Sequence, residues 1–173
     1  MKYWCVLIAL LAHAPVVLAG PLQTPRPLDA WAAESFARGL ARSALVRELV
    51  AVLEASNVIV HIETSTQLPA ELAGVTKFVT SQHGYRYLRI IVRRDLPPLN
   101  RASVLGHELQ HACEIAGSAA DSEAAVRTLF QGIGHTETKQ RDFFETRAAI
   151  QAGRQVYQEL LGRRSRAAAA GSR

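Results

Sequence analysis

Residues 104–112 constrain this chain more than any other stretch, because they place the pattern H-E-x-x-H inside an apolar, helix-favouring run. Residues four apart on a helix lie one above the other, so the imidazoles of His107 and His111 are predicted to converge on a single ion. Glu108 follows the first histidine by about 100° around the helix, where its carboxylate borders the same position. The sequence therefore predicts a helix that carries two histidines and a glutamate as one constellation.

The flanking residues predict where this helix begins and ends. Asn100 follows Pro97 and Pro98 and is a suitable N-cap, while Gly117 is a suitable C-terminal stop. Between these limits, apolar residues recur at helical spacing. They are Leu105, Leu109, Ala112 and Ala116.

Two histidines four residues apart are typical of zinc sites. Neutral imidazole nitrogens bind Zn²⁺ at about 2.0 to 2.1 Å, and three protein ligands leave a fourth position for water. Glu108 is placed to reach that water as a general base. One alternative is a surface helix with solvated side chains. A closed structural site that uses Cys113 is discounted, because Cys113 lies about 240° around the helix from His107.

These residues resemble the zincin superfamily of metallopeptidases. The extended pattern with a third histidine six residues after the second is absent, since Gly117 stands there. The remaining pattern resembles the gluzincin branch, in which a glutamate on a later helix supplies the third ligand. The chain is also similar to small uncharacterised secreted bacterial proteins with this helix order. The resemblance implies a zincin-like domain that hydrolyses peptide bonds.

The resemblance implies that Glu145 is the third zinc ligand. Glu145 is expected in the first turn of the last helix, residues 142–161, on its core-facing stripe. Zinc would compensate the cost of burying its charge. The alternative is local, because Asp142 and Glu145 have the spacing of a capping box. Glu114 is a weaker rival ligand, one turn beyond His111.

Further candidates surround these ligands. In the family an acidic residue often follows the glutamate ligand by four positions and orients a histidine, but Ala149 stands there. Asp121 is the candidate for orienting a ligand histidine in this way. A second donor to the reacting carbonyl oxygen is also expected, and the sequence does not rank its candidates. They are Tyr85, Tyr87, His83, His135, Arg147 and Tyr157.

The N-terminus predicts export. Residues 1–19 read as a signal peptide, with Lys2, an apolar run over residues 3–12 and a small residue, Ala19, before the predicted cleavage. An uncleaved anchor is the alternative, but the segment is short and interrupted. A secreted or periplasmic protein is therefore expected, with no stable membrane span after the signal is removed.

Charge and cysteine content limit the remaining possibilities. The formal net charge is +5, but residues 20–162 carry 15 positive and 15 negative charges. Residues 163–173 form a basic tail that is expected to be disordered. No basic patch with interleaved aromatic residues indicates nucleic-acid binding. Cys113 alone remains after cleavage, so an internal disulfide is excluded.

The hydrophobic pattern predicts a single α+β domain over residues 29–162, preceded by an extended leader over residues 20–28. In proteins that this chain resembles, the strand before the motif helix binds substrate as a sheet edge, so residues 85–93 are the candidate substrate edge. Arginines there would equally serve as ordinary edge protection. The expected helices cover residues 30–41, 43–54, 100–116, 121–130 and 142–161, with Asp29 and Ser43 as the caps of the first two. The expected strands cover residues 57–64, 75–80 and 85–93. Side chains of the first and third strands alternate between a core face and a more polar face, and Gly84 favours a hairpin turn between the second and third.

The predicted function is a secreted zinc peptidase acting on a peptide or protein substrate. One alternative is a secreted zincin-like module that keeps the metal but binds a partner without catalysis. Its small size and the missing partner acid favour that alternative, whereas the intact Glu108 opposes it. A periplasmic interaction protein without metal is the third hypothesis.

Overall fold

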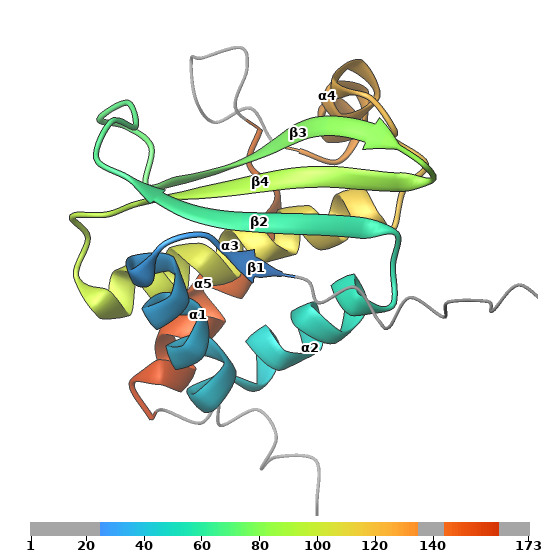
Figure 1. Ribbon diagram of the computed structural model, residues 1–173. Coiled ribbons are helices and arrows are strands. Elements are labelled where there is room, and N and C mark those ends of the chain that lie inside the picture. The colour runs from blue at the N-terminus through green and yellow to red at the C-terminus, as the bar shows by residue number, and fades with distance from the viewer. Residues whose placement is uncertain (1–24, 135–143, 163–173) are drawn as a thin grey trace, which may run out of the picture.

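The computed structural model describes residues 25–134 and 144–162, which form five helices and a four-stranded mixed sheet (Figure 1). The predicted α+β class is confirmed. The predicted signal peptide and basic tail lie outside the described residues. In chain order the elements are β1 (Arg26–Pro27), α1 (Ala30–Arg42), α2 (Ala44–Glu54), β2 (Val58–Ser65), β3 (Gly74–Gln82), β4 (Tyr85–Arg93), α3 (Pro98–Ala116), α4 (Glu123–Ile133) and α5 (Arg147–Leu160).

The sheet has the strand order β1-β2-β4-β3. Strands β1 and β4 pair with β2 in parallel, while β3 pairs with β4 antiparallel. His83 and Gly84 both have positive φ, 52° and 80°, as the tight turn between β3 and β4 requires. The predicted hairpin is therefore confirmed, and the short β1 falls in the segment expected to be an extended leader.

The prediction that residues 85–93 form the substrate edge is wrong. Those residues are β4, which is hydrogen-bonded to β2 on one side and to β3 on the other. Strand β3 is the long edge of the sheet instead. A strand with neighbours on both sides has no free backbone groups to offer to a peptide.

One face of the sheet packs on helices α1, α2 and α3, and α5 packs against α3 (Figure 1). The alternation predicted for β2 and β4 is confirmed, because one set of alternating side chains in each strand is buried in this core. Each buried aliphatic side chain stabilises the fold by about 1.5 to 3 kcal/mol. These side chains are Val58, Val60, Ile62, Leu88, Ile90 and Val92.

Side-chain caps fix where most helices begin. Asp29 and Ser43 cap α1 and α2 as predicted, because each accepts a hydrogen bond from a backbone N–H three residues later. Helix α4 begins at Glu123 after the cap Ser122, two residues later than predicted. Helix α3 begins at Pro98 rather than after Asn100, since a proline at the first helical position loses no hydrogen bond.

Buried arginines hold both ends of α3. Arg101, in its first turn, donates to the carbonyl oxygens of Arg94 and Leu96 and to Glu34. Arg86 of β4 reaches the other end and donates to the carbonyl oxygens of Ile115 and Ala116. Carbonyls at a helix C-terminus lack intrahelical partners, so Arg86 satisfies groups that would otherwise be buried unpaired. The motif helix is thereby fixed against the sheet.

Cys113 lies on α3 between these ends. It is partly buried against the core, and its thiol donates to the carbonyl oxygen of Leu49. Burial raises the pKa of Cys113 to about 12, so its thiol stays protonated at neutral pH. Cys113 therefore packs as a small apolar residue does. Among the described helices, none has the length and apolarity needed to cross a membrane.

Candidate metal centre

The structure brings together the three side chains that the sequence nominated as ligands. His107 and His111 lie on α3, and Glu145 lies just before α5. One ligand atom from each falls within 4.8 Å of the others. Zinc ligands at about 2.0 to 2.1 Å in tetrahedral geometry lie about 3.3 Å apart, so closing on an ion needs only a small inward movement.

Glu145 does not occupy the place predicted for it. Helix α5 begins at Arg147, and Thr146 is its cap, accepting a hydrogen bond from the Ala149 N–H at 3.0 Å. Glu145 therefore lies ahead of the helix, not in its first turn, and the capping-box alternative is wrong. Asp142 lies outside the described residues. From this position ahead of α5, the Glu145 side chain reaches His107 on α3.

One oxygen of Glu145 is buried without a hydrogen-bond donor. Oε2 lies 3.1 Å from His107 Nε2, close enough to attract it, yet no donor in the described part of the chain satisfies it with hydrogen-bond geometry. An unsatisfied buried carboxylate oxygen is costly, and a cation removes that cost. Together with two imidazole nitrogens it forms the donor set of a catalytic zinc site, so these residues fit the metal.

Glu114 orients His111. Its Oε2 lies 2.9 Å from His111 Nδ1, and its Oε1 accepts a hydrogen bond from Thr146 Oγ1 at 2.7 Å. With Nδ1 engaged, Nε2 is left for a metal, which is how carboxylates set the tautomer of ligand histidines. The sequence indicated Glu114 only as a rival ligand. Its spacing of three residues from His111 was the signal for this contact.

Carboxylates dominate the electrostatics of the centre. Burial disfavours a charged imidazolium at His107, but Glu145, Glu108 and Glu114 outweigh it and raise the pKa of His107. Burial alone would raise the pKa of Glu145, but the nearby His107 and His111 outweigh burial and hold this pKa below its usual value. Three carboxylates around two imidazoles favour a cation between them.

Glu108 is held in one position beneath the edge strand. It is 4% exposed, and its Oε2 accepts a hydrogen bond from Thr76 Oγ1 at 2.8 Å. Burial raises the pKa of Glu108, opposed by the charges of His111 and His107 and by Thr76. A Cβ at Gly74 would lie 2.6 Å from Val104 Cγ1 and 2.8 Å from Glu108 Oε1. Only glycine lets β3 approach the carboxylate this closely.

A cavity of about 470 Å³ opens beside these groups. Glu108, His111 and Glu145 line it, and the ring of Phe130 meets that of His111 edge-on at 5.2 Å between centroids. A cavity of this size is within the range of pockets that bind small ligands or short peptide segments. The rest of its lining comes from the edge strand, from α4 and from the segment before α5: Leu72, Gly74, Val75, Thr76, Lys77, Phe78, Glu123, Val126, Arg127 and Phe144.

The other nominated residues lie elsewhere. Asp121 acts on Arg86 through its charge and does not line the cavity, so Glu114 holds the orienting role for which Asp121 was the candidate. Tyr157 is also absent from the lining described above. The same is true of Tyr85, Tyr87, His83 and Arg147, whereas His135 lies outside the described residues. Arg127 and Lys77 are the cationic residues that line the cavity, and the sequence did not single them out.

Replacing Glu114 by Gln tests the orienting contact. We expect zinc affinity to fall by about tenfold, because the amide holds the His111 ring less firmly and lowers the basicity of its free nitrogen. Competition with a coloured zinc chelator gives the dissociation constants. Glu54→Gln, an exposed change on α2, is the control and should match the wild type. Equal affinity for Glu114→Gln would contradict the assigned role.

No protein-family model, curated protein or solved structure matches the chain. What identifies the site is therefore its own geometry. Two imidazoles and an unsatisfied carboxylate oxygen converge at one point, and a buried glutamate lies next to them on a cavity.

Proposed function

We propose that this chain is a secreted zinc-dependent peptidase with a minimal zincin-like fold of gluzincin type. The observation that carries the proposal is the unsatisfied Oε2 of Glu145 beside His107 and His111, at the wall of a cavity that Glu108 also lines. A structural zinc site has no use for a fixed carboxylate next to an open position. The signal peptide predicted from the sequence supports export.

The residues divide into a ligand set and a base. His107, His111 and Glu145 would hold Zn²⁺, with Glu114 orienting His111. When bound, the ion lowers the pKa of water to about 7 and polarises the substrate carbonyl.

Glu108 performs the proton transfers. Thr76 fixes its carboxylate through Oε2, so the base does not rotate away from the cavity. Burial raises its pKa, and a raised carboxyl pKa suits a group that must both take and return a proton. Glu108 takes a proton from the attacking water and passes it to the leaving amide nitrogen. The C–N bond then breaks and the product leaves as a neutral amine.

The edge strand β3 supplies a place for the substrate backbone. Its residues from Gly74 to Phe78 line the cavity, and Thr76 contacts the base. An extended peptide that adds to β3 would pass directly over Glu108. This assigns to β3 the role that the sequence had assigned to residues 85–93.

Bound zinc in the purified mature protein tests the proposal. We expect near one equivalent by atomic emission in the wild type, and loss in both His111→Ala and Glu145→Ala under the same low-metal buffer. Glu48→Ala on α2 is the matched control and should keep the metal. No zinc in the wild type after resupply would overturn the peptidase proposal. Zinc retained in Glu145→Ala would remove Glu145 from the ligand set.

A further inference from the structure

The face of the sheet turned away from the helices carries a row of basic side chains. The strand register pairs Arg26 with His61, His61 with Arg89, and Arg89 with Lys77. Paired residues on neighbouring strands point to the same face, so each of the four strands contributes one member. Strands lie about 4.8 Å apart, and the row therefore spans about 14 Å. We refer to these four residues as the basic row.

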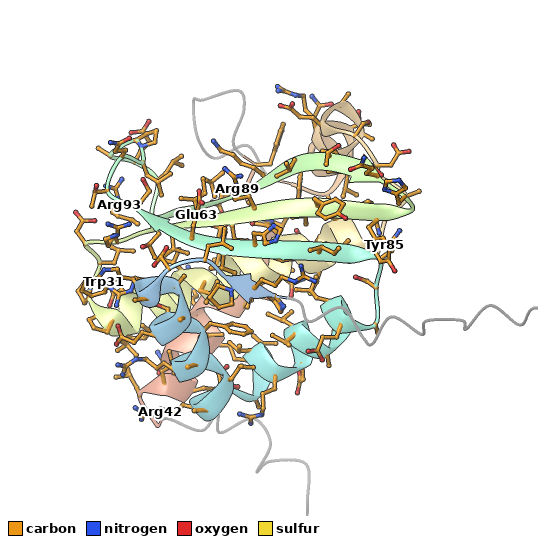
Figure 2. The ribbon with its side chains drawn as sticks, viewed as in Figure 1. Trp31, Arg42, Glu63, Tyr85, Arg89 and Arg93 are labelled. Carbon is orange, nitrogen blue, oxygen red and sulfur yellow. The ribbon has the colours of Figure 1, made fainter. Side chains whose placement is uncertain are left out.

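The basic row lies on the face of the sheet opposite the buried core. The next residues along the strands, Ile62 and Ile90, are buried against the helices, and alternation directs their neighbours outward. Figure 2 shows Arg89 on the side of the sheet opposite α1 and α2. Lys77 and Arg89 are exposed, while Arg26 and His61 are half-buried.

This face has little negative charge of its own. Glu63 is the one carboxylate among the residues of the four strands. Its Oε1 lies 3.9 Å from Arg89 Nη1, with 30% of the Glu63 side chain and 49% of the Arg89 side chain exposed. An exposed pair at that separation contributes less than about 1 kcal/mol. Residues 20–162 are neutral as a whole, whereas the basic row places Arg26, Arg89 and Lys77 against the single carboxylate Glu63.

Aligning like charges across a sheet is unfavourable, because directly opposed cations repel. Burial, followed by the charges of Arg26 and Arg89, lowers the pKa of His61. Three permanent cations therefore remain in the row at neutral pH. An anionic partner laid across the strands would offset their repulsion.

We propose that the basic row is an exosite for an acidic segment of the polypeptide substrate. The proposal rests on the proposed peptidase function, since Lys77 also lines the cavity beside Glu108. The row thus begins at the edge strand of the cleft and leads away from it across the sheet. Carboxylates at alternate positions of an extended chain lie about 6.8 Å apart, so three of them match the length of the row.

Binding of a labelled peptide with glutamate at alternate positions tests the exosite. Fluorescence anisotropy is read on the mature chain carrying Glu108→Gln, without zinc, so that neither metal nor cleavage is needed. We expect affinity that falls as salt rises, and about fivefold weaker binding after Arg89→Glu. Arg42→Glu, an exposed change at the end of α1 far from the sheet in Figure 2, is the matched control and should bind as well as the parent.

Unchanged binding after Arg89→Glu, or no binding at low salt, would overturn the exosite. Tighter binding of a sulfated polysaccharide or of single-stranded DNA, with the same dependence on Arg89, would overturn its assignment to polypeptide. Circular dichroism establishes that each variant is folded. Binding is measured without zinc and without cleavage, so its result does not depend on the peptidase proposal. If the peptidase proposal fails, Arg89-dependent binding of the peptide can still be observed, and the two failures can be told apart.

Discussion

Replacing Glu108 by Gln is expected to reduce peptide hydrolysis by about 10² to 10⁴-fold, while bound zinc stays near one equivalent. The amide has nearly the shape of the carboxylate, and its oxygen still accepts the Thr76 hydrogen bond, so the cavity keeps its form. What is lost is the ability to take a proton from water. Hydrolysis of a quenched fluorescent peptide library, with zinc measured on the same samples, gives both quantities.

The same substitution is expected to leave the zinc-free protein at least as stable as the wild type. Burial raises the pKa of Glu108 above its unfolded value, so ionisation opposes folding at any pH above the unfolded pKa. The neutral amide removes that cost. Loss of activity by Glu108→Gln would then not be due to unfolding, and thermal melting checks this.

Two outcomes would contradict the assigned chemistry. Activity retained by Glu108→Gln would show that another group is the base. A wild-type protein that binds zinc but hydrolyses nothing in the library would favour the non-catalytic zinc module. Glu48→Gln, an exposed change on α2, is the control and should retain activity.

Local chemistry in the sequence was enough to predict most elements. The caps Asp29 and Ser43, the alternation in β2 and β4, and the His83-Gly84 turn each depend on residues close together in the chain. The face of α3 that carries His107 and His111 follows from helical spacing alone. These predictions succeeded because neighbouring residues determine them.

Apart from shifts of about two residues at the starts of α3 and α4, the errors concern contacts between distant residues. Periodicity shows which side chains of β4 face the core, but it cannot show that β2 pairs with β4 in parallel and leaves β3 at the edge. Likewise, the start of α5 depends on Thr146, whose hydroxyl bonds Glu114, 32 residues earlier in the chain. The resemblance made Glu145 a candidate ligand, whereas its position ahead of the helix required the tertiary structure.

The buried guanidinium of Arg86 is expected to contribute more to stability than any other polar side chain of the four strands. Besides the α3 carbonyls, it donates to the carbonyl oxygens of Ser118 and Ala120 and to Asn57 Oδ1. Arg86→Met is expected to lower the free energy of unfolding by about 3 to 5 kcal/mol, because several buried acceptors lose their donor at once. Urea denaturation measures the change.

Arg89→Met is the matched control for Arg86→Met, since Arg89 lies on the same strand but faces solvent. It should change the free energy of unfolding by less than about 0.5 kcal/mol. A similar small loss in Arg86→Met would mean that water replaces the guanidinium at the end of α3.

If the large loss is found, the strand that lies inside the sheet also secures the helix that carries the candidate zinc ligands. His111 lies one turn before Ile115, whose carbonyl Arg86 binds at 2.7 Å. The stability of the sheet and the geometry of the metal centre would then depend on the same side chain.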